Sequence, residues 1–264
     1  MKVRKYNGCG NDFVIIDDRA GLDYNTLAQE LCQDSQFDTD GLIGVKQEPL
    51  EMIFYNRDGS RAPMCGNGIR CFAKYVYEAG IVTEKEFPVE TLAGTLTVRI
   101  TQEEPFECRV QMGQAYYDNQ LIGASDQESF QQRTIELSTG MVEITSLFVG
   151  TIHTVVFVED AVAEIELSRG SEICHHPLFK EQTNVNFVQV LNEQELLVRT
   201  FERGVGWTLA CGTGCCAAYV VARDLGKVTS QPVIVHLEQG QLEISGDAEI
   251  IMAGPAVFEK EVTV

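Results

Sequence analysis

A cysteine followed by Gly-x-Gly and then by a helical pattern occurs twice in this chain, and this repeat restricts the possible folds more than any other feature. The copies are Cys65-Gly66-Asn67-Gly68 and Cys211-Gly212-Thr213-Gly214. After each copy, apolar residues recur at spacings of three and four, which predicts a helix with a buried face. The two cysteines are 211 − 65 = 146 residues apart in a chain of 264. We interpret the repeat as an ancient duplication that gives two similar α/β halves around a cleft.

The rest of the pattern supports this interpretation. Strand-like segments outnumber helical ones, and hairpin signals such as Ala93-Gly94 are frequent. A further helix is expected over residues 160–175. The sequence therefore predicts an α/β (α+β) fold of two pseudo-symmetric halves. Each half is a mixed β-sheet or barrel around a central helix, and the active site lies in the cleft between them.

The domain boundary is placed in a polar, weakly patterned stretch at residues 114–130. Residues 1–115 then form the N-terminal half, which carries Cys65, and residues 116–254 form the C-terminal half, which carries Cys211. The tail at 255–264 is strand-like and able to pair back onto the first half.

Charge and composition exclude several classes of partner. The 20 basic and 39 acidic residues give a net charge of −19 without a basic patch, which disfavours nucleic acid and anionic membrane surfaces. No segment approaches the ~20 apolar residues of a membrane span, and the N-terminus does not read as a signal peptide. The nine cysteines are odd in number and scattered, which favours reduced thiols and a cytoplasmic protein. Neither the cysteines nor the four histidines show metal-ligand spacing, so no metal site is predicted.

The paired cysteine turns suggest one kind of chemistry. A helix N-terminus with free backbone N–H groups binds anions and lowers the pKa of a thiol placed there. Two such turns facing each other would hold one carboxylate between two thiols. Inversion of a carbon centre needs a base on one face and an acid on the other, which a thiolate and a thiol supply. Amides gathered at the carboxylate would stabilise the enolate-like charge, by roughly 3–4 kcal/mol per donor in known oxyanion holes.

Further motifs accompany the two turns: Lys5-Tyr6-Asn7-Gly8-Cys9-Gly10-Asn11-Asp12-Phe13, Tyr55-Asn56 with Asp58-Gly59-Ser60, Thr183-Asn184-Val185-Asn186-Phe187, and Glu202-Arg203-Gly204. In these motifs the chain resembles the diaminopimelate epimerase family, whose members are two-cysteine epimerases that work without pyridoxal phosphate. The resemblance covers nearly the whole chain. It implies two pseudo-symmetric halves, a site in the cleft between them, an amino-acid substrate and no cofactor.

The resemblance also implies roles for single residues. Cys65 and Cys211 match the acid/base pair, and His153 and Glu202 match the residues that tune those thiols. The positions that match substrate contacts and carboxylate-binding amides are Asn11, Asn56, Asn184, Arg203, Gly66, Asn67, Gly212 and Thr213. Without the motifs, His153 would be interpreted as a core histidine, the asparagines as turn residues and Glu202-Arg203 as a solvated ion pair.

Two departures from the family pattern concern the substrate. Thr151 stands in Gly150-Thr151-Ile152-His153, where family members usually have asparagine, and Trp207 replaces a usual glutamate. If Trp207 faced the cleft, its ring would stack on an aromatic or cationic side chain. Both positions are therefore candidate substrate contacts, and they favour an amino acid such as histidine modestly over LL-diaminopimelate.

Other interpretations of the sequence are less favoured. A non-catalytic amino-acid-binding relative is disfavoured because both cysteines and Glu202 are present. An isomerase of the wider fold with a non-amino-acid substrate is disfavoured because such relatives usually lack one or both cysteines. A disulfide between Cys65 and Cys211 is expected only as a side reaction of oxidation. A homodimer is left open.

Overall fold

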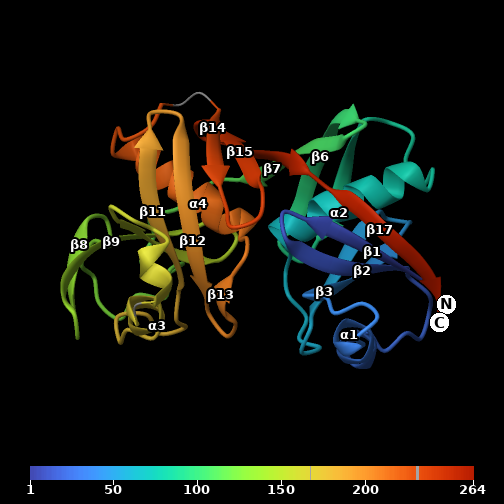
Figure 1. Ribbon diagram of the computed structural model, residues 1–264, viewed down its shortest axis with the longest axis horizontal. Coiled ribbons are helices and arrows are strands. Elements are labelled where there is room, and N and C mark those ends of the chain that lie inside the picture. Colours follow the sequence, from blue (N-terminus) through green and yellow to red (C-terminus); the bar gives the residue numbers. More distant parts are fainter. Residues whose placement is uncertain (167, 230–231) are drawn as a thin grey trace. The chain divides into compact units, whose positions relative to one another are not determined.

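The computed structural model describes residues 1–166, 168–229 and 232–264, which form two compact units. The first unit comprises Met1–Gln111 together with Ala253–Val264, and the second comprises Met112–Met252. Figure 1 shows the elements of each unit.

In the first unit, strands surround one buried helix (Figure 1). β1 pairs with β2 and with the last strand, β17, and the order continues through β3, β4, β5, β6 and β7. The pairs β2–β3 and β4–β5 are parallel, and the others are antiparallel. The elements are β1 Lys2–Gly8, β2 Asn11–Asp17, α1 Tyr24–Gln33, β3 Gly41–Lys46, β4 Glu51–Asn56, α2 Gly66–Glu78, β5 Glu86–Thr91, β6 Gly94–Glu103, β7 Phe106–Gly113 and β17 Val257–Thr263.

The second unit repeats this order. β9 and β10 form a hairpin, β11 is parallel to β10, β12 returns antiparallel, and α4 leads to β14, which is parallel to β12. The elements are β8 Arg133–Leu137, β9 Gly140–Phe148, β10 Ile152–Phe157, α3 Arg169–Cys174, β11 Asn184–Asn192, β12 Glu195–Glu202, β13 Gly206–Thr208, α4 Gly212–Asp224, β14 Val233–His236, β15 Gln241–Ser245 and β16 Ile250–Pro255. The predicted mixed α/β fold is thus confirmed, and each unit has the same succession of hairpin, helix, hairpin and central helix.

The central helices are buried over most of their length, although α2 also carries the polar residues Asn67, Arg70 and Lys74. All residues from Gly66 to Val76 of α2 are buried, and most of Gly212–Ala222 in α4 is buried as well. Such helices belong to the interior of a domain. Each therefore fixes its first turn, and the cysteine that precedes it, against the surrounding strands.

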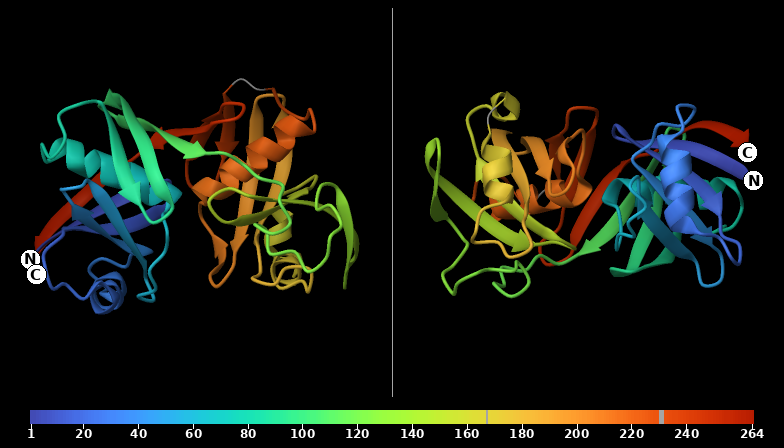
Figure 2. Two further views of the ribbon diagram at one scale, coloured as in Figure 1. Left: turned by 180° about the vertical axis from the view of Figure 1, so that it is seen from behind. Right: turned by 90° about the horizontal axis from the view of Figure 1, so that it is seen from below.

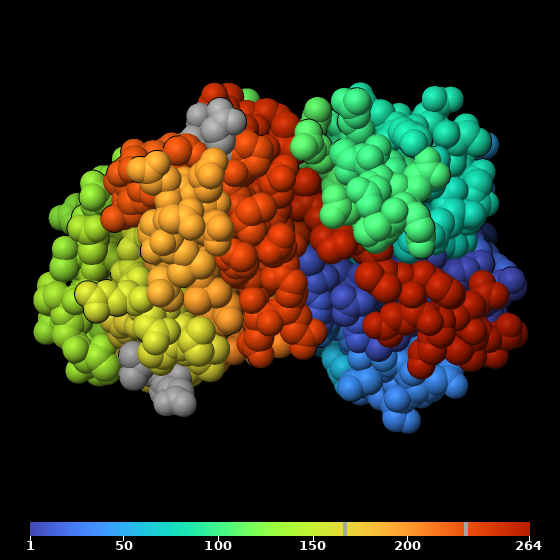
Figure 3. Space-filling model, turned by 45° about the horizontal axis from the view of Figure 1, so that its top comes forward, coloured from blue at the N-terminus to red at the C-terminus, as the bar shows by residue number. Residues whose placement is uncertain are grey.

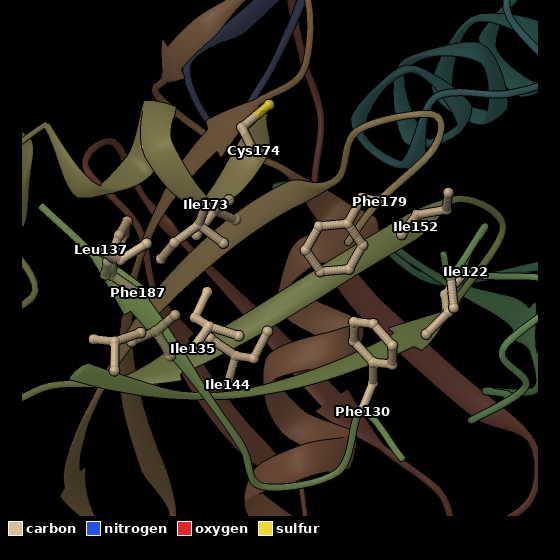
Figure 4. Close-up of a cluster of buried hydrophobic side chains, with 14 of the residues drawn as sticks. Ile122, Phe130, Ile135, Leu137, Ile144, Ile152, Ile173, Cys174, Phe179 and Phe187 are labelled. Atoms are coloured by element: carbon tan, nitrogen blue, oxygen red, sulfur yellow. The ribbon is translucent and has the colours of Figure 1, made fainter. Parts of the chain in front are cut away.

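An apolar cluster forms the core of the second unit beside α3, β8, β9 and β11. Figure 4 shows Ile135 and Ile144 among the side chains of this cluster. The rings of Phe130 and Phe179 contact each other with 5.4 Å between their centroids. Phe187 of β11 is fully buried in the same cluster. This packing gives β10 and β11, which carry the predicted site residues His153 and Asn184, a rigid support.

The last strand of the chain belongs to the first unit. β17 pairs antiparallel with β1, from Lys2 opposite Thr263 to Asn7 opposite Val257. The two ends of the chain lie side by side in both views of Figure 2, and in Figure 3 the red C-terminal strand covers part of the first unit's surface. The ion pair between Arg4 and Glu261, at 2.8 Å, crosses the same two strands.

Two parts of the second unit differ from what the sequence predicts. The helix expected over 160–175 is replaced by a 3₁₀ turn at Ala163–Glu166 and the short helix α3, while residue 167 lies outside the described residues. Asp160 accepts hydrogen bonds from the backbone of Val162 and Ala163, which starts a local turn where a long helix was expected. The short strand β13 was not predicted. Every helix within the described residues is too short or too polar to span a membrane.

Candidate active site

Cys65 is the N-cap residue of α2. Its backbone is extended (φ −133°, ψ 121°), and its Sγ accepts a hydrogen bond from the Gly68 amide at 3.4 Å. The thiol is partly exposed. Sulfur thus takes the position that serine or aspartate usually takes at a helix start, beside the positive end of the helix dipole.

Polar side chains hold the first turn of α2 in place. The buried guanidinium of Arg70 donates to the Gly66 carbonyl at 3.1 Å and to Asn67 Oδ1 at 3.0 Å. Asn67 Nδ2 donates in turn to Asn11 Oδ1 at 2.5 Å, and Asn11 Nδ2 donates to Asp40 at 3.1 Å. This chain of hydrogen bonds fixes which way both amides point, and it brings two of the predicted substrate contacts together.

Asn56 is the last residue of β4 and lies opposite Gly41 of β3. Its Nδ2 donates to Ser60 Oγ at 3.0 Å, and its backbone N–H donates to the Ser60 carbonyl. The side chain is therefore held by the turn that follows β4.

Cys211 is the N-cap residue of α4 and has the same extended backbone as Cys65 (φ −134°, ψ 106°). Its Sγ lies 3.5 Å from Thr213 Oγ1. Burial, and then the nearby negative charge of Glu202, raise the pKa of the Cys211 thiol well above its ordinary value, against smaller opposing effects of Thr213 and the Gly214 amide. Cys211 is thus protonated at neutral pH, and Glu202, which accepts a hydrogen bond from Thr208 Oγ1 at 2.7 Å, acts on it electrostatically.

His153 lies on β10 and is fully buried. Its Nδ1 is 3.1 Å from Asn186 Nδ2, while its Nε2 has no hydrogen-bond partner among the residues that the structure describes. Burial, reinforced by the positive charge of Arg203, lowers the pKa of His153 to about 3. The imidazole is therefore neutral at physiological pH.

Three of the predicted substrate contacts meet around Arg203. Asn184 Oδ1 accepts a hydrogen bond from the Arg203 backbone amide at 3.0 Å. The guanidinium donates to the carbonyl of Glu181 at 3.0 Å and to Thr151 Oγ1 at 3.4 Å. The threonine hydroxyl thus contacts the arginine from the position where the family usually has asparagine.

Trp207 lies on β13 and packs against the apolar core of the second unit. Its ring is 5.7 Å from that of Phe187 and 5.6 Å from that of Phe201, the latter edge to face. The side chain is partly buried by these contacts. The Trp207 ring, predicted to stack on a substrate if it faced the cleft, therefore contacts two aromatic rings of its own unit.

Two polar residues in these networks were not singled out from the sequence. Arg70 lies on the buried face of α2, and a cation among Ile69, Phe72 and Ala73 is a signal that could have marked it. Asn186 follows Asn184 by two residues on β11, so period-two alternation places both on one face of the strand. A buried asparagine at such a position needs hydrogen-bond partners.

Comparison with known proteins agrees with these features. A family model described as diaminopimelate epimerase matches residues 3–117 and 145–259. Relatives named diaminopimelate epimerase include one from Moorella thermoacetica, 41% identical over 270 residues, which cover 97% of this chain and 96% of the relative. Another, from Alkaliphilus metalliredigens, is 39% identical over 268 residues, with 97% and 94% covered.

Solved structures share the fold at low identity. A probable proline racemase from Agrobacterium radiobacter superposes with a TM-score of 0.75 at 14% identity, covering all of this chain and 92% of the other. A protein of the PhzF family from Bacillus anthracis gives 0.73 at 16% identity, covering 100% and 98%. The matched family model, the nearly full-length relatives and the two cysteine-capped helices lead to one conclusion: the chain belongs to the diaminopimelate epimerase family and is an isomerase.

Proposed function

We propose that this isomerase is a diaminopimelate epimerase, which inverts one α-carbon of LL-diaminopimelate to give the meso form. The observation that carries the proposal is the presence of both cysteine-capped helices in a chain whose nearly full-length relatives, at 36–41% identity, bear that name. Proton transfer between two thiols is the chemistry that these helices suit.

In the proposed reaction, Cys65 and Cys211 act from opposite faces of the α-carbon. Cys211 starts as the thiol, because burial and Glu202 raise its pKa. Cys65, whose sulfur accepts a hydrogen bond at the helix start, starts as the thiolate. The Cys65 thiolate takes the Cα proton, the electron pair moves into the carboxylate as an enolate, and the Cys211 thiol returns a proton from the other face. The reverse reaction starts from the opposite protonation of the pair.

The α-carboxylate is the group that the two helix starts would bind. Backbone amides at Gly66 and Asn67 in one unit, and at Gly212 and Thr213 in the other, lie in first helical turns, where N–H groups lack intrahelical partners. Such donors act most strongly on the charge that develops as the proton leaves. Arg70 and Asn11 support the first of these turns through Asn67.

The distal end of the substrate is assigned to Arg203, Asn184 and Asn56. A guanidinium is well suited to a second carboxylate, and Arg203 is held by Asn184 and reaches Thr151. Thr151 keeps a hydroxyl beside the arginine where an asparagine is usual. Trp207 packs against Phe187 and Phe201 and is only partly buried, so it stays a proposed substrate contact.

Another α-amino acid, with histidine first among them, is the second candidate, and Thr151 is the observation that favours it. The deciding experiment measures deuterium incorporation at Cα in D₂O for LL-diaminopimelate and a panel of L-amino acids. Exchange and inversion with diaminopimelate alone support the proposal. Exchange only with histidine would assign the second candidate, and ligand protection without any exchange would indicate a binding protein.

Single-cysteine variants test the two-thiol mechanism. Cys65→Ser and Cys211→Ser should each reduce epimerisation by at least 100-fold, because general acid–base groups typically contribute 10²–10⁴-fold. Each variant should still exchange or eliminate from one face of a substrate with a β-leaving group, which needs only one base. Cys32→Ser, at a buried cysteine outside both turns, is the matched control and should keep its activity. Near-normal epimerisation by either active-site variant would contradict the mechanism.

A further inference from the structure

Asn186 contacts His153 through a fully buried amide. Asn186 lies on β11 and has no exposed surface. Its Nδ2 is 3.2 Å from the Thr154 carbonyl and 3.1 Å from His153 Nδ1, and its Oδ1 accepts a hydrogen bond from Thr200 Oγ1 at 3.1 Å. Every polar atom of this side chain is therefore engaged.

These contacts fix the orientation of the amide. A backbone carbonyl can only accept hydrogen bonds, so the amide nitrogen of Asn186 must be the atom that faces Thr154. Rotation of the amide by 180° would place two oxygens against each other. The two hydrogens of Nδ2 then point to the Thr154 carbonyl and to His153 Nδ1. A neutral imidazole that accepts at Nδ1 carries its proton on Nε2.

The other ring nitrogen is a buried donor that has no hydrogen-bond partner among the residues that the structure describes. His153 Nε2 is buried, and the low pKa of the ring keeps it neutral at the pH of the reaction. A buried N–H without a partner is costly, and such groups in native proteins often have a functional role. Here the N–H group without a partner belongs to His153, a residue of the candidate site.

The same amide also touches the helix that carries Cys211. A Cβ added to Gly214 would lie 2.3 Å from Asn186 Oδ1 and 3.3 Å from Cys211 Sγ. The amide oxygen of Asn186 thus packs directly on the first turn of α4. One side chain therefore links the ring of His153 to the turn of the second cysteine.

We infer that Asn186 is a positioning residue that holds His153 neutral with its proton on Nε2, so that the ring keeps a hydrogen-bond donor at Nε2 and accepts no proton during the reaction. This rests on the proposed function for the reaction itself, while the protonation of the ring is a property of the folded protein without substrate. No proton transfer through His153 is required, because the two thiols already exchange the proton of the α-carbon.

The state of the ring can be observed directly. In a ¹⁵N-histidine-labelled protein, two-bond ¹H–¹⁵N spectra distinguish protonated from unprotonated ring nitrogens, and the His153 signals are assigned by their loss in His153→Gln. The expected result is an unprotonated Nδ1 and a protonated Nε2 that stay unchanged between pH 5.5 and 9. A protonated Nδ1 in the wild-type protein would overturn the inference.

Asn186→Asp tests the positioning role. A carboxylate can only accept, so it should draw the proton of His153 to Nδ1 and leave Nε2 without one. We expect kcat to fall at least tenfold with little change in KM, since a wrong histidine tautomer costs about 10⁴-fold in kcat in a serine protease. Thr200→Val is the matched control, because it removes a hydrogen bond to Oδ1 of the same amide and leaves both Nδ2 contacts. It should lower the melting temperature without moving the ring proton.

The outcomes separate this inference from the proposed function. If Asn186→Asp moved the proton and kcat stayed within twofold of wild type, the positioning role would be wrong. If the ring signals were as expected but diaminopimelate showed no Cα exchange, the proposed substrate would fail, and the assignment of Asn186 would be tested with the amino acid that does exchange. If Asn186→Asp did not fold, the wild-type spectrum would still decide the protonation.

Discussion

His153 is a titratable side chain with no contact with water. In the unfolded chain a histidine has a pKa near 6.5, whereas burial lowers the pKa of His153 in the folded protein to about 3. Between these values the unfolded state binds a proton that the folded state does not. The contribution of His153 to stability is therefore fully present above pH 6.5 and is lost as the pH falls toward 3.

Replacing His153 with glutamine should flatten this dependence. Below pH 6.5 the free energy of unfolding should fall less steeply in His153→Gln than in wild type, by up to about 1.4 kcal/mol per pH unit. Urea denaturation at pH 7, 5 and 4 measures the difference. His175→Gln, at an exposed histidine, is the control and should follow wild type. Parallel curves for His153→Gln and wild type would show that the ring is charged in the folded protein.

For individual residues, the sequence predicted features that depend on neighbouring positions. It did not predict contacts between residues that are far apart in the chain. The helix caps at Cys65 and Cys211 follow from a glycine-rich turn before an apolar helix, all within a few positions. The contact of Thr151 with Arg203 joins residues 52 positions apart, and it depends on how β10 and β12 are arranged. The packing of Trp207 on Phe187 likewise needs the sheet to be known.

The central helices α2 and α4 occupy the same place in their units, but their first turns are packed differently. A Cβ at Gly68 would lie 3.2 Å from Cys65 Cβ and from Ile43 Cδ1, whereas a Cβ at Gly214 would lie 2.3 Å from Asn186 Oδ1. Side-chain shifts of a few tenths of an ångström can relieve the first contact. The second requires the Asn186 amide to leave its hydrogen bonds.

Gly214→Ala should therefore destabilise the protein, and Gly68→Ala should be close to neutral. Overpacking costs typically 1–3 kcal/mol, while alanine gains about 1 kcal/mol over glycine in a helix. We expect a net loss of up to about 2 kcal/mol for Gly214→Ala and less than about 0.5 kcal/mol for Gly68→Ala. Chemical denaturation of the two variants side by side measures this. A larger loss at Gly68 would contradict the packing described for these turns.

At the scale of elements, the strand-like segments and hairpin signals predicted a fold in which strands outnumber helices, and the structure has this composition. Two elements differ from the prediction. Residues 160–175 have helical spacing, but Asp160 caps a short turn there, and the long helix does not form. β13 is defined by its pairing with β12. Its three residues are too few to show the alternation of apolar and polar residues that marks a strand.

The first unit is completed by a strand from the far end of the chain. β17 covers the outer edge of β1, and its contacts include the ion pairs of Arg4 and Lys2 with Glu261 and the ring contact of Tyr6 with Phe258 at 5.3 Å. The ion pairs are exposed or partly exposed, and such pairs contribute little. The backbone ladder and the covering of an unpaired edge are the larger effects.

Removal of residues 256–264 should destabilise the first unit and leave the second intact. Trp207, the single tryptophan, lies in the second unit and reports on it by fluorescence. Alkylation of the buried Cys32 and Cys71, followed by mass spectrometry, reports on the first unit. We expect faster alkylation of both thiols in the truncated chain, with an unchanged fluorescence transition. Equal protection of these thiols in both chains would show that β17 is dispensable.

The place of β17 also has a consequence during synthesis. A ribosome releases all of Met112–Met252 before it releases Ala253–Val264. Until then, the edge of β1 that pairs with β17 is unpaired in the nascent chain. An uncovered strand edge invites pairing with other chains. The interval in which the newborn protein is most open to misassembly therefore lasts as long as translation of its entire second unit.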